Sequence, residues 1–397
     1  MKSPFSQGSY GYDAEFLSKN NIDFIELNDP GSKATVLIVP GYQGRVMTSS
    51  VSGDEGTSYG WINYSLIESG EKNDQFNPYG GEERFWLGPE GGDFSIYFEE
   101  GEEQEFPNWN VPKFIDTEPF DLISQSPQSV SFQKDFTLRN ASGTQLHIGI
   151  ERKVRILSRG EADHALAVTL DTSLSFVGYE SENVLINRGE FDWDRSTGAL
   201  SIWMLSMFNP SEKGVVVIPF HEGKDMDLGK IVTDDYFGKV PSDRLITRNG
   251  LLLFKTDGKF RSKIGLSPYR ALPYCGSYDS ENQVLTLLKY SQADQASVYV
   301  NSKWGAQEDP FLGDVLNAYN DGPVEDGSIM GPFYEIESSS PAALISAGNQ
   351  ISHTQQIFHI TGEENKLSFI TEKLFGMTIN DIKEAFEKKE IMESTNN

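Results

Sequence analysis

Residues 77–92, NPYGGEERFWLGPEGG, concentrate charged and aromatic side chains between glycines. At the two-residue period of a β-strand, Arg84, Trp86 and Glu90 fall on one face, while the residues between them face the opposite way. An arginine fork, an indole plate and a carboxylate on one face can stack against a polyhydroxylated ring and hydrogen-bond its hydroxyl groups. The alternative is a half-buried structural strand in which Glu82 or Glu90 neutralises Arg84.

A second segment rich in reactive side chains spans residues 331–359, GPFYEIESSSPAALISAGNQISHTQQIFH. If its first part is a strand, Glu335 and Glu337 share a face about 7 Å apart. Two carboxylates that close disfavour simultaneous ionisation once they are partly buried. One of them is therefore expected to act as a general base, and its neighbour as a tuned acid or a metal ligand.

The later part of the same segment is expected to return as the second strand of a hairpin, after a turn at residues 348–349. His353, Gln355 and His359 would then share one side of the returning strand, so that acid, base and donor meet across the hairpin. The alternative is that the two glutamates line an exposed sheet face and that both histidines are ordinary surface or capped residues.

Three further places could add binding groups, because loops on a rigid sandwich commonly carry them. Trp61 and Asn63 are expected to share a strand face in GDEGTSYGWIN. Residues 317–323, NAYNDGP, read as a loop dense in amide and carboxylate groups, including Asn320, although such a sequence is first of all a turn. Trp304 precedes that loop and could supply another stacking plate.

Residues 192–198, DWDRSTG, begin like a calcium-binding loop, but Trp203 stands where the twelfth-position glutamate is required. This segment is therefore predicted to be a hairpin turn. Phosphate-binding loops, the GxSxG elbow and the HExxH motif are absent from the sequence, which leaves nucleotide chemistry unsupported. Cys275 has no neighbouring histidine that would nominate it as a nucleophile.

The chain of 397 residues is strongly acidic, with 59 Asp and Glu against 33 Lys and Arg and a formal charge of -26. Such a charge repels nucleic acid and anionic membrane surfaces, so partners are expected to be neutral or cationic. One cysteine excludes an internal disulfide framework. No signal peptide or membrane span is visible, so a soluble protein is expected, either cytoplasmic or exported with its signal removed.

Most of the chain reads as short strands separated by turn signals, which predicts an all-β, mostly antiparallel protein. Helical periodicity occurs at residues 13–19 and at residues 364–389, where Gly376 divides the run. We expect one β-sandwich domain over residues 1–362 and a helical appendage packed on it over residues 363–397. The expected strands are 35–39, 94–98, 129–138, 146–157, 165–177, 183–193, 199–207, 215–220, 250–255, 263–266, 283–290, 333–338 and 353–360.

Five motifs, in this order, resemble an uncharacterised bacterial family of the galactose mutarotase-like superfamily, which includes the aldose 1-epimerases. They are GTSYGWIN, NPYGGEERFWLGPEGG, DGKFRSKIGL, NAYNDGP and GPFYEIESSSPAALISAG. The resemblance extends over nearly the whole chain. It implies a large antiparallel β super-sandwich whose concave sheet binds carbohydrate.

The resemblance also implies roles for individual residues. Glu335 or Glu337 would correspond to a late-strand glutamate that removes the proton of the anomeric hydroxyl in mutarotases, and Arg84 to an arginine that orients the sugar hydroxyls. The mid-chain histidine motif of those enzymes is missing, because the histidines at positions 147, 164 and 221 sit in unrelated contexts. A histidine acid would then have to come from His353 or His359.

The leading hypothesis is a carbohydrate-active protein that binds a mono- or oligosaccharide on the concave face of a β-sandwich and that could be an epimerase-like enzyme with a glutamate base and a histidine acid. Such ring opening needs an acid and a base but no organic cofactor. A variant places a divalent cation, zinc or manganese, between His353, His359 and one glutamate. The alternatives are a noncatalytic glycan-binding module and a glycoside hydrolase that pairs Glu90 with Glu335.

Overall fold

The computed structural model describes residues 3–294, 297–324 and 326–387. Its helices are α1 (Tyr10–Lys19), α2 (Tyr64–Ser69), α3 (Lys113–Asp116), α4 (Arg159–Leu166), α5 (Asp225–Leu228), α6 (Glu364–Phe375) and α7 (Ile379–Lys383). Its strands are β1 (Ile25–Asn28), β2 (Thr35–Val39), β3 (Arg45–Ser50), β4 (Arg84–Gly88), β5 (Asp121–Ser126), β6 (Ser129–Arg139), β7 (Gln145–Ile156), β8 (Ser175–Asn187), β9 (Ser201–Phe208), β10 (Gly214–Pro219), β11 (Leu245–Arg248), β12 (Leu251–Lys255), β13 (Ser262–Leu266), β14 (Tyr274–Asp279), β15 (Val284–Tyr290), β16 (Leu316–Asn320), β17 (Tyr334–Ser339) and β18 (Gln350–Thr361).

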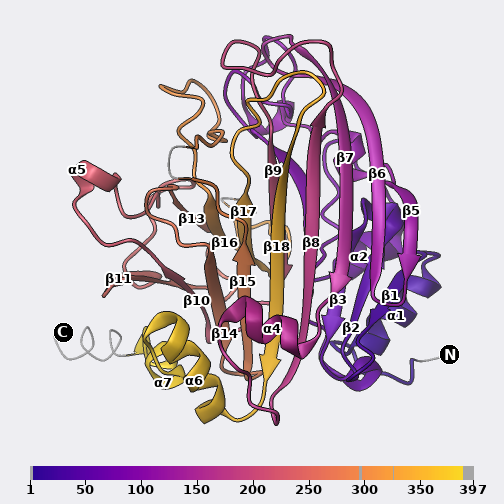
Figure 1. Cartoon of the computed structure of the whole chain (residues 1–397), viewed down its shortest axis with the longest axis vertical. Coiled ribbons are helices and arrows are strands. Elements are labelled where there is room, and N and C mark those ends of the chain that lie inside the picture. Colours follow the sequence, from indigo (N-terminus) through magenta and orange to yellow (C-terminus); the bar gives the residue numbers. More distant parts are fainter. Residues whose placement is uncertain (1–2, 295–296, 325, 388–397) are drawn as a thin grey trace.

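Most of the described strands belong to two antiparallel sheets. The larger has ten strands in the order β11-β12-β10-β14-β15-β18-β8-β7-β6-β5, and the smaller has five in the order β13-β16-β17-β9-β4. Figure 1 shows the ten-stranded sheet spanning the molecule from β11 at one side to β5 at the other. Apolar side chains from both sheets form one core cluster between them, so the predicted antiparallel β-sandwich is confirmed.

Buried polar side chains also connect the two sheets. Arg152 of β7 donates to Glu83, which precedes β4, at 2.8 Å, and Glu83 accepts a further hydrogen bond from Gln355 of β18 at 2.9 Å. Ser338 of β17 donates to Gln355 at 2.7 Å. Because these groups are paired with one another, their burial costs far less than that of isolated charges.

Helices cover the opposite face of the ten-stranded sheet. Leu367 and Ile370 of α6 and Ile382 of α7 join a second apolar cluster with side chains of β10, β12, β14, β15 and β18. Figure 1 shows α4, α6 and α7 against the lower part of this sheet. Gly376, with a φ of 67°, ends α6 at the predicted break, and residues 388–389 of the predicted helix lie outside the described residues.

A small three-stranded sheet, β1-β2-β3, adjoins the sandwich near the N-terminus. Helices α1 and α2 pack against it through a cluster that includes Leu17, Leu37, Met47 and Ile67. The predicted helix at residues 13–19 is thus the later part of α1. None of the described helices is long and apolar enough to cross a membrane.

Several local predictions were wrong. Residues 94–98 form bends rather than a strand, and residues 165–177 begin in α4, which starts with a capping box between Ser158 and Glu161. Residues 317–320, predicted as part of a loop, belong to β16, because Leu316 and Ala318 supply the apolar alternation that a strand needs.

The predicted hairpin between residues 333–338 and 353–360 does not form. Strand β17 pairs with β16 and β9, whereas β18 pairs with β15 and β8, so the two strands lie in different sheets. The predicted hairpin turn at residues 192–198 also connects different sheets, because β8 belongs to the large sheet and β9 to the small one. Turn signals in the sequence mark both connections but do not reveal which sheet follows.

Candidate functional site

Strand β4 presents its side chains alternately to the two sides of the five-stranded sheet. Glu83, two positions before Phe85, pairs with Arg152 of the ten-stranded sheet, so Glu83 and Phe85 face that sheet. Arg84 and Trp86 therefore point away from the ten-stranded sheet, toward the side that we call the outer face. The predicted shared face is confirmed for Arg84 and Trp86, since the Arg84 guanidinium lies over the Trp86 indole at 4.3 Å from the ring centroid, whereas Glu90 lies beyond the end of β4.

Strand β17 brings the two predicted glutamates to the same outer face. Tyr334 contacts Ser277 of the large sheet at 2.7 Å, so its neighbour Glu335, and with it Glu337, points outward. Arg84 Nη2 donates to Glu335 Oε1 at 2.8 Å, and the two side chains are only 6% and 7% exposed. Arg84 is thus paired across the sheet rather than with Glu82 or Glu90.

Glu337 lies at the centre of a second polar contact. Its Oε2 accepts hydrogen bonds from the indole N–H of Trp203 at 2.9 Å and from Lys263 Nζ at 2.8 Å. Lys263 also lies over the Trp203 ring at 5.1 Å. The other oxygen, Oε1, is buried without a hydrogen-bond partner among the described residues. We refer to Arg84, Trp203, Lys263, Glu335 and Glu337 as the outer-face cluster.

Burial on the outer face raises the pKa of two carboxyl groups. Burial raises the pKa of Glu335 to about 7, with Arg84 opposing the shift and the charge of Glu337 adding to it. Burial also raises the pKa of Glu90, with Lys263 opposing and Glu337 adding. A carboxyl with a pKa near neutrality can accept and return a proton under physiological conditions, as general acid–base catalysis requires.

Four half-buried side chains border the cluster. Glu90 follows β4 after a cis Gly88-Pro89 bond, and its backbone N–H donates to the Ser302 hydroxyl at 3.1 Å. Trp304 packs edge-on against Phe98 with ring centroids 5.1 Å apart. On the other side, Tyr236 donates its hydroxyl hydrogen to Asp314 Oδ2 at 2.6 Å. The border therefore combines aromatic plates with carboxylates.

Little solvent reaches the outer-face cluster. Arg84 and Glu335 are each 5% exposed, Trp203 is 6% exposed and Glu337 is 1% exposed. Lys263 is the most open member, with 14% of its side chain exposed, so solvent enters the cluster at the lysine.

The two predicted histidines lie on the other side of the sheet. His353 Nε2 is 2.8 Å from the hydroxyl of Ser338, which points to the inner face, and His359 Nε2 is 2.8 Å from Glu82 Oε1. Both imidazoles are buried between the sheets, and burial lowers the pKa of His353 to about 3. The expected meeting of these histidines with Glu335 and Glu337 was therefore wrong, because β18 faces the opposite side of β17.

The proposed cation site fails for the same reason. A cation held by His353 and His359 cannot also reach Glu335 or Glu337 through the sheet that separates them. Among residues 3–294, 297–324 and 326–387, no three His, Cys, Asp or Glu side chains are grouped so that they could hold a metal ion.

Three of the remaining predicted binding residues have structural contacts. Trp61 packs on the outer face against Met207, Tyr319 and Phe333, 8% exposed. Asn63 caps α2 by accepting from the backbone of that helix, so it does not share a strand with Trp61. The fully buried Asn320 donates to a backbone carbonyl and accepts from Gly258 N at 2.9 Å, which ties down a turn.

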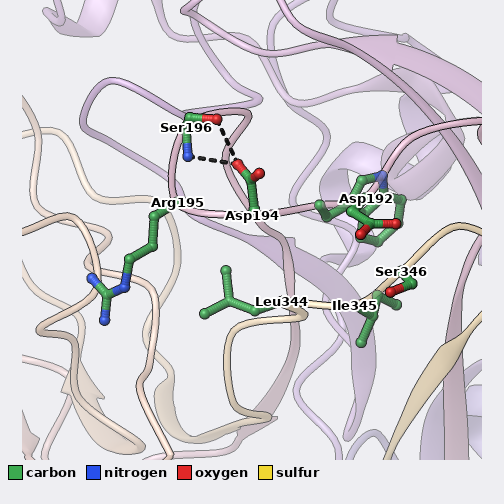
Figure 2. Close-up of a pocket in the computed structure, with 8 residues that line it drawn as sticks. Asp192, Asp194, Arg195, Ser196, Leu344, Ile345 and Ser346 are labelled. Carbon is green, nitrogen blue, oxygen red and sulfur yellow. Dashed lines mark hydrogen bonds between the residues drawn. The ribbon is translucent and has the colours of Figure 1, made fainter.

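The structure has pockets away from the cluster. A pocket of about 750 Å³ is lined by Trp61, Asn63 and residues of two neighbouring turns. Figure 2 shows another, of about 520 Å³, between residues 192–196 and 344–346. There Asp194 Oδ1 accepts from both the backbone N–H and the hydroxyl of Ser196 at 2.7 Å, so the carboxylate stabilises the turn.

The sequence reasoning missed Trp203, Lys263, Tyr236 and Asp314. Trp203 lies in the apolar run SIWMLSMF, which is typical of a buried core strand. The two-residue period of a strand could still have placed its indole on the same face as Met207. Lys263 is the charged residue of a short strand whose partner strands lie far away in sequence. The last two residues lie outside the strands and carry no periodic signal.

Comparison with solved structures finds similar overall architectures at low sequence identity. The Slr1438 protein from Synechocystis sp. PCC 6803 is 12% identical, with 86% of this chain and 96% of that chain covered and a TM-score of 0.49. A galactose mutarotase-like protein from Lactobacillus casei is 11% identical, with 85% and 100% covered and a TM-score of 0.46. A galactose mutarotase related enzyme from Lactobacillus acidophilus is 9% identical, with 85% and 97% covered and a TM-score of 0.45.

Comparison with sequences gives a family but no characterised relative. No curated protein sequence matches the chain. A family model, described as a family of unknown function, matches residues 8–386, which include every strand of both large sheets and the whole outer-face cluster. The expected membership of an uncharacterised family is confirmed, and the chain belongs to the family of unknown function DUF6786.

Proposed function

We propose that the outer face of the five-stranded sheet binds a saccharide and that Glu335 transfers a proton to or from it. The observation that carries this proposal is the pairing of Arg84 with Glu335 at 2.8 Å, where burial raises the glutamate pKa to about 7. At neutral pH such a carboxyl is present in both protonation states, so it can take a proton from a sugar hydroxyl and give it back.

The surroundings suit a sugar ring with many hydroxyl groups. Trp304 is half-buried and can offer an apolar plate, while Lys263 and Arg84 supply donors and Glu337 an acceptor. Trp86 is 3% exposed and stacks on Arg84, so its role is to support the guanidinium. Trp304 therefore replaces Trp86 as the expected stacking residue.

The test is a glycan array followed by proton NMR of anomeric exchange in any reducing sugar that binds. We expect Glu335→Gln to abolish exchange while binding stays nearly intact. The matched control is Glu182→Gln, which makes the same chemical change at an exposed position of β8 in the other sheet. Exchange that survives in Glu335→Gln would contradict the assignment of Glu335.

A noncatalytic glycan-binding module is the competing function. It predicts that no bound sugar undergoes exchange and that Trp304→Ala causes the largest loss of affinity. It is favoured by the separation of both interior histidines from the outer face, which leaves Glu335 without the histidine acid that was expected. If neither an array nor NMR detects any sugar, both functions are refuted.

A further inference from the structure

The outer face carries more carboxyls than cations. Arg84 pairs with Glu335 and Lys263 pairs with Glu337, each at 2.8 Å. Glu90 lies at the border of this cluster without an ion pair to any described residue. Lys263, which already pairs with Glu337, is the cation that lowers the pKa of Glu90, so these two carboxyls share one cation.

A second border residue repeats the pattern. Asp314 accepts from the Tyr236 hydroxyl at 2.6 Å but forms no ion pair within the described part of the chain. Gly265 leaves room for this contact, because a Cβ at that position would lie 2.2 Å from Asp314 Oδ2. Burial raises the pKa of Asp314 as it does that of Glu90. Counted with the cluster, four carboxyls face two cations.

Buried polar atoms without partners add independent evidence for a missing ligand, because Arg84 Nε and Nη1 and one carboxylate oxygen are unpaired within the described residues. Glu337 is 1% exposed, and its Oε1 has no hydrogen-bond partner within the described residues, although Oε2 holds both Lys263 and Trp203. The charge of Glu337 acts on Glu90, so the two carboxyls share one electrostatic environment. A buried acceptor of this kind is normally satisfied by a ligand or by ordered water.

A ligand ammonium fits these observations better than a hydroxyl group. A hydroxyl supplies one donor and no charge, whereas an ammonium supplies three donors and neutralises one carboxylate. Trp304 is half-buried beside Glu90, with its indole N–H toward the Glu90 carboxyl and its ring stacked on Trp109 at 6.2 Å between centroids. The formal charge of -26 on the whole chain also raises the local concentration of cationic ligands.

We propose that the saccharide bound on the outer face is an amino sugar with a free ammonium group, and that Glu90 pairs with that ammonium. This inference rests on the proposed saccharide site and names the class of its ligand. Arg84 and Glu335 contact the hydroxyl groups of the ring, while Glu90 selects for the charged substituent. Glu90 is a specificity-determining residue in this arrangement, and Lys263 keeps Glu337 in place next to it.

The experiment compares the dissociation constants of glucosamine, N-acetylglucosamine and glucose for the wild-type protein at pH 7 and low salt. It is repeated with the galactose series. We expect the free amine to bind about tenfold more tightly than either the acetylated or the neutral sugar, and the preference to shrink in high salt because the pairing is electrostatic. Glu90→Gln should bring the three constants together, whereas Glu182→Gln should leave the preference unchanged.

The outcomes separate this inference from the proposed function. Equal affinity for all three sugars in the wild-type protein refutes the ammonium assignment and leaves the saccharide site standing. A preference for the amine that persists in folded Glu90→Gln refutes the role of Glu90. The wild-type comparison needs no variant, so the test holds even if Glu90→Gln fails to fold. Binding of none of the sugars refutes the saccharide site and the inference with it.

Discussion

Replacing Arg84 with methionine is the most direct perturbation of the outer face. The change removes the partner of Glu335 while keeping an apolar chain of similar length. In the native protein Glu335 has a pKa of about 7 against an ordinary value of 4.5, so the folded state binds its proton more tightly than the unfolded state. The stability contributed by protonated Glu335 is fully present below pH 4.5 and is lost as the pH rises through 7.

The cost of Arg84→Met has two parts. Loss of the hydrogen bond and of the contact with the Trp86 indole should lower the free energy of unfolding by about 1–3 kcal/mol at any pH. Above pH 7 a second part appears, because Glu335 would be ionised without its partner. The Glu335 carboxyl of the variant can remain protonated instead of ionising. The additional loss in the free energy of unfolding therefore cannot exceed about 1.4 kcal/mol for each pH unit above 7, or about 3 kcal/mol at pH 9.

Urea unfolding at pH 6 and pH 9 measures both parts. We expect the loss caused by Arg84→Met to grow by up to about 3 kcal/mol between the two pH values. In a Glu335→Gln background the same change should cost equal amounts at both, because no carboxyl remains to titrate. Equal losses at pH 6 and pH 9 with Glu335 present would refute the view that Arg84 supports the ionised glutamate.

Two other substitutions test the separation of the faces. His353→Ala removes an imidazole that hydrogen-bonds Ser338 and Ser291. It should lower the free energy of unfolding by about 2–4 kcal/mol without changing sugar affinity. A loss of sugar binding in calorimetry by a protein that remains folded would place His353 in the site instead. Gly265→Ala inserts a methyl group where the Asp314 carboxylate now lies. It should weaken the preference for the amino sugar when dissociation constants are compared with those of the neutral sugar. An unchanged preference would show that Asp314 does not contribute to amine binding.

Periodicity anticipated the faces of the strands well. The alternation in residues 84–87 assigned Arg84 and Trp86 to one side, and the alternation in β17 assigned Glu335 and Glu337 to one side. These predictions succeeded because the direction of a side chain depends on its own strand and on its immediate neighbours. The β-rich composition and the turn signals gave the fold class by the same local reasoning.

Partners across the sheets could not be obtained in this way. Arg84 and Glu335 are 251 positions apart, and their contact exists because β9 lies between β4 and β17 in the small sheet. The separation of the histidines from the glutamates depends on residues 340–349 crossing to the other sheet instead of closing a hairpin. Local signals mark a turn in both cases and are silent about which strands it joins.

The sequence by itself determined that this protein is a predominantly antiparallel β structure and that its arginine, tryptophan and glutamates occupy defined faces of their strands. Only the tertiary structure decided that Glu335 meets Arg84 while His353 and His359 lie buried behind the sheet. The physical reason is that strand pairing is chosen by the burial of apolar surface across the whole chain, which no local pattern encodes.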